Sequence, residues 1–256
     1  MMNKLSMGTI NDKTLNEKGS LYAQPLPDYG VVEGRLSQHD YDQLWETIKL
    51  ASQNPIDIKK SLAGVISTSL DLIPALQERQ KTTPFLSQFL SDAIRMYCTE
   101  YGTVRLLGDL ETKSRIGWDL ISMWVNFQRE NEFNPLHDHA GVLSFVIWMR
   151  VPYESKDQEK LDIAQRSNSK HDVGNFSFSY SDILGGTRSF LYPMGKDKEG
   201  MMVMFPSKLK HQVFPFYNCK EERVSISGNL DIPIKSLVSQ IGGLQFFSGG
   251  VGKNES

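Results

Sequence analysis

The sequence has little cysteine, with Cys98 and Cys219 as the two thiols in 256 residues. Two cysteines cannot build a disulfide framework or the cysteine-rich sites that hold structural zinc and iron–sulfur clusters. One cross-link between them is compatible with the sequence, although a reducing compartment would keep both thiols free. Any metal site in this chain must therefore use histidine and carboxylate ligands.

Long hydrophobic runs and long blocks of basic residues are also absent. The longest apolar stretches, such as residues 142–149, fall far short of the roughly 20 residues that cross a bilayer. The first twenty residues lack the apolar centre of a secretory signal. The formal net charge is -2, and nucleic-acid surfaces need clustered Lys and Arg. We therefore expect a cytoplasmic protein that uses neither a membrane nor a nucleic acid as partner.

The chain is 39% apolar, which is enough for a sizeable core. Its residue composition and its apolar pattern change along its length. We expect a polar N-terminal arm over residues 1–36, a helical segment over 37–117 that packs on the core, a β-rich core over 118–233 and a C-terminal tail over 234–256. The first segment is polar and without period, whereas the β-rich core is divided by Gly, Pro, Asn and Asp.

Three helices are predicted in the second segment. Ser37 and Asp40 resemble a capping box ahead of apolar residues at helical spacing, so a helix should start there. A second helix should start at Thr83 with Pro84 at its first position and end at Gly102. Between them, residues 61–76 are predicted to form a further helix that is broken near Pro74.

The third segment contains short runs that are rich in β-branched and aromatic residues. Six strands are predicted, over residues 118–127, 142–151, 175–180, 188–192, 201–205 and 223–230. Many short strands without intervening helices indicate a sandwich or barrel and not a parallel α/β sheet. The expected fold class is therefore mainly β with N-terminal helices and a jelly-roll core. Residues 154–172 are charged and lack an apolar period, so we expect an inserted surface loop there.

The segment FNPLHDHAGVLSFVIWM places His137 and His139 one residue apart, just ahead of a predicted strand. Side chains alternate along a strand, so the two imidazoles should share one face while Asp138 points to the other. Two imidazoles on one face can bind a single first-row metal ion. Spacing alone favours two solvent-facing residues of a turn after Pro135 over a metal site.

Two later elements add to this pattern. His211 lies in FPSKLKHQVFPF, after a Phe-Pro turn and before a strand. In EERVSISGN, alternation places Arg223 and Ser225 on one strand face, where a guanidinium fork and a hydroxyl could bind a carboxylate together. Each element alone has an ordinary structural explanation, but the three in this order favour a shared site.

The ordered set HDH, FPSKLKH and ERVSISGN resembles the iron(II)- and 2-oxoglutarate-dependent oxygenases, whose jelly roll is a double-stranded β-helix. More narrowly, WVNF, HDHAGVLSFVIWM, MVMFPSKLKHQVFPF and ERVSISGN resemble a branch of these oxygenases found in bacteria and abundant in cyanobacterial phages. A phage origin would place the protein in the host cytoplasm. The likeness covers residues 118–233 and does not define a substrate.

The resemblance implies roles for individual residues. His137 and His211 would bind Fe(II), and Arg223 with Ser225 would hold the distal carboxylate of the co-substrate 2-oxoglutarate. Asn126 would contact co-substrate or substrate, with a structural role at a bulge as the alternative. The implied reaction is hydroxylation of an unknown substrate with release of succinate and CO2, with ascorbate as an accessory reductant.

The third metal ligand departs from the wider superfamily, which has a carboxylate where this chain has His139. We expect His139 to complete a three-histidine site, because strand alternation places it beside His137. A bulge that turned Asp138 inward would give the alternative set of His137, Asp138 and His211. His39 and His171 are expected to be solvated and receive no role.

Two other functions fit part of this pattern. One is a cupin-like enzyme with three histidines and no 2-oxoglutarate, against which Arg223 and Ser225 argue. The other is a non-catalytic jelly-roll module that binds sugars or assembles phage particles. The expected partner of an enzyme would be a small molecule or a peptide, and apolar helix positions could serve a homodimer as well as a core.

Overall fold

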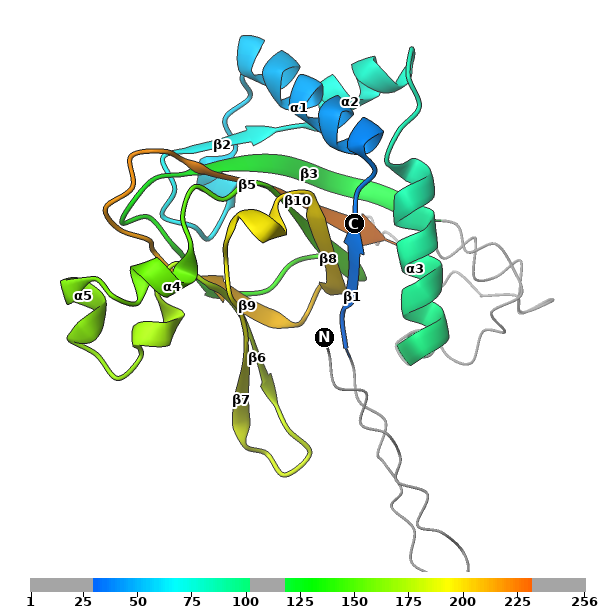
Figure 1. Cartoon of the computed structure of the whole chain (residues 1–256). Helices are drawn as coiled ribbons and strands as arrows, with labels where there is room; N and C mark the ends of the chain where they lie inside the picture. Colours follow the sequence, from blue (N-terminus) through cyan, green and yellow to red (C-terminus); the bar gives the residue numbers. More distant parts are fainter. Residues whose placement is uncertain (1–29, 102–117, 232–256) are drawn as a thin grey trace, which may run out of the picture.

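The structure is a computed structural model that describes residues 30–101 and 118–231, and it contains two antiparallel sheets (Figure 1). The six-stranded sheet has the order β1 (Val32–Arg35), β8 (Met201–Pro206), β5 (Leu143–Arg150), β10 (Arg223–Asp231), β3 (Asp119–Gln128) and β2 (Thr68–Asp71). The four-stranded sheet has the order β4 (Asn134–His137), β9 (Lys210–Val213), β6 (Phe176–Ser181) and β7 (Thr187–Tyr192). From β3 to β10 the chain alternates between the sheets, apart from the β6–β7 hairpin. This winding confirms the expected double-stranded β-helix.

The period-2 pattern of β5 shows why the larger sheet is covered on both faces. Leu143, Ile147 and Met149 belong to an apolar cluster shared with the helices, whereas Val146 and Trp148 belong to a second cluster shared with β6 and β7. Seven of the eight residues of β5 are buried. A strand buried on both faces is nearly all apolar, as residues 143–149 are apart from Ser144.

The helices lie beside the larger sheet, on the face away from the smaller one (Figure 1). They are α1 (Gln38–Gln53), α2 (Ile73–Gln80) and α3 (Ser87–Tyr101), and a 3-10 turn, η1 (Lys59–Ser61), precedes β2. The Ser37 hydroxyl accepts a hydrogen bond from the Asp40 amide at 3.1 Å, so the predicted cap of α1 is confirmed. No helix of the described ranges is long and apolar enough to span a bilayer.

Two of the predicted helix positions are wrong. Residues 61–76 do not form a helix, because Thr68–Asp71 pairs with β3 as strand β2, and Pro74 lies in the first turn of α2. Proline is tolerated in a first turn because that turn's amides have no helical acceptor. The last predicted helix starts at Ser87 and not at Thr83, because Leu86 adopts a left-handed φ of 64° that no α-helix continues.

The segment predicted as a surface loop over residues 154–172 is folded, which corrects that prediction. It contains α4 (Ser155–Gln158), α5 (Asp162–Gln165) and the 3-10 turn η2 (Lys170–Asp172), and η3 (Lys196–Lys198) follows β7. Gln158 exchanges two hydrogen bonds with the backbone of Tyr217, at 3.0 and 2.8 Å. Ala164 is 2% exposed. These anchors fix the segment against the β core despite its charged composition.

All six predicted strands are present, with ends that differ by one residue at most. Four strands were not predicted, namely β1, β2, β4 and β9, and each has four residues. Most of the expected arm, the helix end at Gly102, and the tail lie outside the described residues, so the division into four segments stays a prediction.

Candidate functional site

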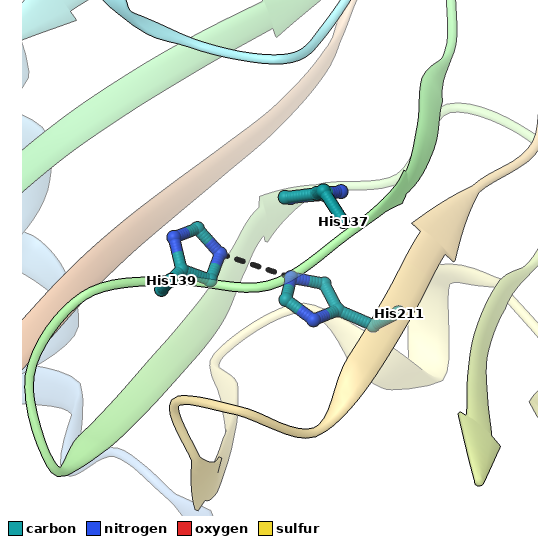
Figure 2. A group of neighbouring side chains, drawn as sticks. All are labelled: His137, His139 and His211. Atoms are coloured by element: carbon teal, nitrogen blue, oxygen red, sulfur yellow. Dashed lines mark hydrogen bonds between the residues drawn. The ribbon is translucent and has the colours of Figure 1, made fainter.

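Three histidines, two in strands of the smaller sheet and one just after β4, meet in one group (Figure 2). His137 ends β4 and lies directly opposite His211 of β9 in the strand register. His139 lies just beyond β4, where its amide donates to the Ser207 carbonyl at 2.8 Å. One potential ligand atom from each histidine lies within 4.8 Å of the others. The structure thus brings together all three histidines that the sequence singled out.

The ring nitrogens are arranged in a way that suits a metal ion. Nε2 of His139 lies 2.9 Å from Nε2 of His211 (Figure 2). Two nitrogens that are each about 2.1 Å from one ion, at right angles, lie about 3 Å apart. Nδ1 of His137 is 2.7 Å from the Pro135 carbonyl, and Nδ1 of His211 is 2.9 Å from the Leu209 carbonyl. Donation from Nδ1 to a carbonyl leaves Nε2 with its lone pair, as metal-binding histidines require.

Burial keeps these imidazoles uncharged. It lowers the pKa of His139 to about 4 and that of His211 to about 3, and the neighbouring His137 adds to both effects. Burial also lowers the pKa of His137. A neutral imidazole is the form that binds a metal ion, so the three side chains do not need to release protons near pH 7.

The Asp138 carboxylate does not join the histidines. It forms ion pairs with Lys208, at 3.4 Å, and with Lys210. The hydrogen bond from Lys210 is the main cause that holds the pKa of Asp138 below its usual range. This placement favours His139 over Asp138 as the third ligand, because two lysines already neutralise the carboxylate outside the group.

Arg223 enters the same cavity from β10 and is 2% exposed. Its guanidinium donates to the Tyr153 hydroxyl at 2.6 Å, to the Gly174 carbonyl at 3.1 Å and to Oε1 of Gln128. Within residues 30–101 and 118–231, no Asp or Glu forms an ion pair with Arg223. A buried cation without a counter-ion is costly, so this guanidinium is ready to receive an anion from the cavity.

Ser225 and Asn126 line the same cavity as the histidines and Arg223. The strand register places Ser225 opposite Asn126 on one side and opposite Trp148 on the other, so the three form one row on the inner face of the larger sheet. Asn126 is 4% exposed, and its Oδ1 accepts a hydrogen bond from the Ser69 hydroxyl at 2.7 Å. That bond orients the amide and turns its Nδ2 donor toward other partners.

These groups line a single cavity of about 210 Å³. Trp124 lies against His139 with ring centroids 5.5 Å apart, while Trp148, Phe176 and Phe205 supply further apolar wall. The loop of residues 61–64 lines it as well. The other two histidines are elsewhere: His39 is exposed, and His171 pairs with Glu159 at 3.0 Å.

Sequence reasoning missed the residues that surround the Arg223 guanidinium. Gln128 could have been predicted, because strand alternation places it on the same face as Asn126. The structure places it opposite Arg223. Tyr153 and Gly174 carry no such signal, since they lie outside the strands and are 70 and 49 residues from Arg223 in the chain. The buried Ser144 hydroxyl bonds to Ser207 and Asn229.

Comparison with known proteins gives one family match. Residues 122–229 match the family described as "Putative 2OG-Fe(II) oxygenase", a range that contains the three histidines, Arg223 and Ser225. No protein among the curated sequences matches this chain.

Solved structures give weaker likenesses. A Pseudomonas putida prolyl-4-hydroxylase is 14% identical, with 80% of this chain and 94% of that chain covered and a TM-score of 0.44. A Trichoplax adhaerens prolyl hydroxylase in complex with a hypoxia inducible factor peptide fragment is 12% identical, with 82% and 86% covered and a TM-score of 0.44. A Burkholderia pseudomallei oxidoreductase of the 2OG-Fe(II) oxygenase family is 13% identical, with 79% and 84% covered and a TM-score of 0.43. TM-scores below 0.5 do not carry a conclusion about activity.

Proposed function

We propose that this protein, whose residues 122–229 match the family described as "Putative 2OG-Fe(II) oxygenase", is an Fe(II)- and 2-oxoglutarate-dependent oxygenase that hydroxylates a small molecule or a peptide. The observation that carries the proposal is the pairing of two unsatisfied groups in one cavity. Three neutral imidazoles and a buried guanidinium line that cavity, and within residues 30–101 and 118–231 no carboxylate pairs with the guanidinium.

In this proposal, His137, His139 and His211 hold the ion through their Nε2 atoms. Arg223 and Ser225 bind the distal carboxylate of 2-oxoglutarate, and Asn126 donates through Nδ2 to the co-substrate or the substrate. When bound, the ion and 2-oxoglutarate supply an oxidation by O2 that is coupled to decarboxylation of 2-oxoglutarate to succinate and CO2. The chain supplies binding, orientation and a cavity with apolar walls.

Charge balance supports a dianionic co-substrate. Three neutral ligands leave both charges of a divalent ion uncompensated, and Arg223 adds a third positive charge at the other end of the cavity. The two carboxylates of 2-oxoglutarate would offset two of the three charges, one at each end. A monoanion would leave either the ion or the guanidinium without a counter-charge in a site of low polarity.

The Trp124 ring and the loop of residues 61–64 contribute to the proposed site without touching the carboxylate clamp. The indole packs on His139 and limits how that imidazole can turn. Gly64 permits close approach of the loop to the β core, since a Cβ there would lie 1.7 Å from Oδ1 of Asn134. A loop at that position would limit the access of water to the proposed metal end.

The test is binding followed by turnover. Mn(II), as a stable substitute for Fe(II), and 2-oxoglutarate should each raise the melting temperature, with a larger rise when both are present. A ligand at 100 times its Kd stabilises by about 2.7 kcal/mol. With Fe(II), O2 and ascorbate, 2-oxoglutarate consumption should yield equal succinate, and Arg223→Met should abolish this without loss of Mn(II) binding.

Other outcomes point to the other functions. Metal binding without any response to 2-oxoglutarate would favour the three-histidine enzyme that uses no co-substrate. If neither ligand stabilises the protein, a non-catalytic jelly-roll module becomes the better description.

A further inference from the structure

The Arg223 guanidinium is bound to the protein along one side. An arginine has five N–H donors, two on each Nη and one on Nε. Nη1 makes two hydrogen bonds, to the Tyr153 hydroxyl and the Gly174 carbonyl, and Nη2 makes one, to Oε1 of Gln128. Within the described part of the chain, Nε and the second N–H of Nη2 have no protein acceptor. In a guanidinium, the Nε–H and the N–H of Nη2 beside it form one edge, which can bind a carboxylate in bidentate fashion.

The Tyr153 hydroxyl binds the guanidinium of Arg223 at Nη1. This hydroxyl donates to the Gly174 carbonyl at 2.5 Å, so its lone pairs are left to accept from Nη1 at 2.6 Å. The ring is 7% exposed and stacks on Phe216, with centroids 4.6 Å apart and planes 28° from parallel. Burial raises the pKa of Tyr153, so the group remains a neutral phenol.

The backbone around Tyr153 leaves little freedom for this arrangement. Gly174 has a φ of +74°, and a Cβ at that position would lie 2.9 Å from Cε2 of Tyr153. Its amide donates to the Pro215 carbonyl at 2.8 Å, next to Phe216. The phenol thereby connects three segments of the chain. They are the segment after β5, the segment before β6 and the segment after β9.

Gln128 fixes the guanidinium from the opposite direction. Its Nε2 donates to the Glu132 carbonyl at 2.5 Å, which determines the orientation of the amide and turns Oε1 toward Arg223. Gln128 is 3% exposed and lies directly opposite Arg223 in the β3–β10 register. Neither Gln128 nor Tyr153 carries a charge, so both can orient the guanidinium without neutralising it.

We propose that Tyr153 is a positioning residue that holds Nη1 of Arg223 so that the Nε–Nη2 edge faces the distal carboxylate of the co-substrate. This inference rests on the proposed function and adds a residue outside the family motifs. It also gives Gly174 a role, since its carbonyl accepts hydrogen bonds from both the Tyr153 hydroxyl and the Arg223 guanidinium.

The test is Tyr153→Phe, which keeps the stacked ring and removes only the hydroxyl. A hydrogen bond to a charged group is worth more than a neutral one, so the Kd of 2-oxoglutarate in the Mn(II)-loaded protein should rise about tenfold. The Kd of Mn(II) should not change. In turnover, the KM for 2-oxoglutarate should rise by a similar factor, whereas kcat at saturation should stay within about twofold.

Two controls separate positioning from general damage. Tyr192→Phe makes the same chemical change in the same layer between the sheets, where the hydroxyl donates to Glu33 at 2.6 Å, and it should bind 2-oxoglutarate as the unaltered protein does. The analogue 2-oxopentanoate has a methyl group in place of the distal carboxylate. Its weaker binding should be insensitive to Tyr153→Phe, because it makes no contact that depends on Arg223.

The possible results are distinct. If the unaltered protein binds Mn(II) and 2-oxoglutarate and Tyr153→Phe binds both with unchanged affinity, the positioning inference is wrong and the proposed function stands. If the unaltered protein does not bind 2-oxoglutarate, both are wrong. If Tyr153→Phe does not fold, Gln128→Met removes the acceptor of Nη2 in a side chain of similar size, and an unchanged affinity there contradicts the inference in the same way.

Discussion

His139 is the residue at which this site differs most from a two-histidine, one-carboxylate arrangement. Its Nε2 lies 2.9 Å from that of His211, whereas the neighbouring Asp138 is held outside by Lys208 and Lys210. Surface ion pairs of this kind contribute little to stability, because water and salt screen them. Their consequence here is the orientation of the Asp138 side chain, since they keep its carboxylate away from three neutral imidazoles.

The first residue-scale prediction compares the two neighbours. His139→Ala should weaken Mn(II) binding by roughly a hundredfold or more, because loss of a ligand costs more than the 10–100-fold typical of an outer partner. Asp138→Ala should leave Mn(II) affinity within about twofold. Isothermal titration of both variants measures this. Normal affinity in His139→Ala with loss in Asp138→Ala would show that Asp138 turns inward to bind the ion.

At the scale of single elements, α1 shows how local chemistry fixes a helix end. Ser37 caps the helix and also donates to the Asp40 carboxylate at 3.0 Å, while the other oxygen of Asp40 accepts from the Leu86 amide at 2.9 Å. The same aspartate thus connects the start of α1 to the residue before α3. The left-handed φ of Leu86 is compatible with this contact and sets where α3 begins.

The element-scale prediction is therefore a cap deletion. Ser37→Ala should lower the free energy of unfolding by about 1 kcal/mol, because the Asp40 amide loses its acceptor. The matched control is Ser52→Ala in the last turn of the same helix, where the hydroxyl only bonds back to the Ile48 carbonyl. That change should be neutral or slightly stabilising. Urea unfolding of both variants measures the difference, and equal effects would contradict the role of Ser37.

Elements also differ in how well they can be predicted. The six longer strands have enough alternating or β-branched residues to be recognised alone, whereas β2 and β4 are four-residue strands whose pairing depends on a partner far along the chain. Residues 68–71 read as helical by composition and form a strand because the β3 edge offers them a full set of hydrogen bonds. Similarly, residues 154–172 carry charge on their surface but are anchored by Gln158 and Ala164.

At the scale of the whole molecule, the larger sheet separates two apolar clusters. The cluster on the helix side contains Leu44, Leu90 and Cys98, whereas the cluster between the sheets contains Trp148, Phe176 and Phe205. The cavity opens within the second cluster. A ligand bound in the cavity should therefore protect the cluster on the helix side only if that cluster becomes exposed when the whole molecule unfolds.

The whole-molecule prediction uses Cys98 as a reporter of that unfolding. Cys98 is 2% exposed and burial raises its pKa, so its thiolate is scarce and inaccessible, while Cys219 is half-buried. In Cys219→Ser, a thiol reagent should modify Cys98 only as fast as the chain opens. Mn(II) with 2-oxoglutarate should slow that modification at least tenfold, whereas Cys98→Ser should show rapid labelling of Cys219 with or without ligands. Ligand-independent labelling of Cys98 would show that the helix side opens separately.

The sequence by itself determined the six longer strands, the order of the three motifs and therefore the resemblance to a family, because alternation and residue chemistry are local properties. It also determined that His137 and His139 could share a face. Only the tertiary structure decided which groups surround Arg223, since Gln128, Tyr153 and Gly174 come from three separate parts of the chain. It likewise decided that Asp138 turns to two lysines, because their positions depend on how β9 pairs with β4. Contacts between residues about 70 positions apart follow from sheet topology, and no local pattern encodes them.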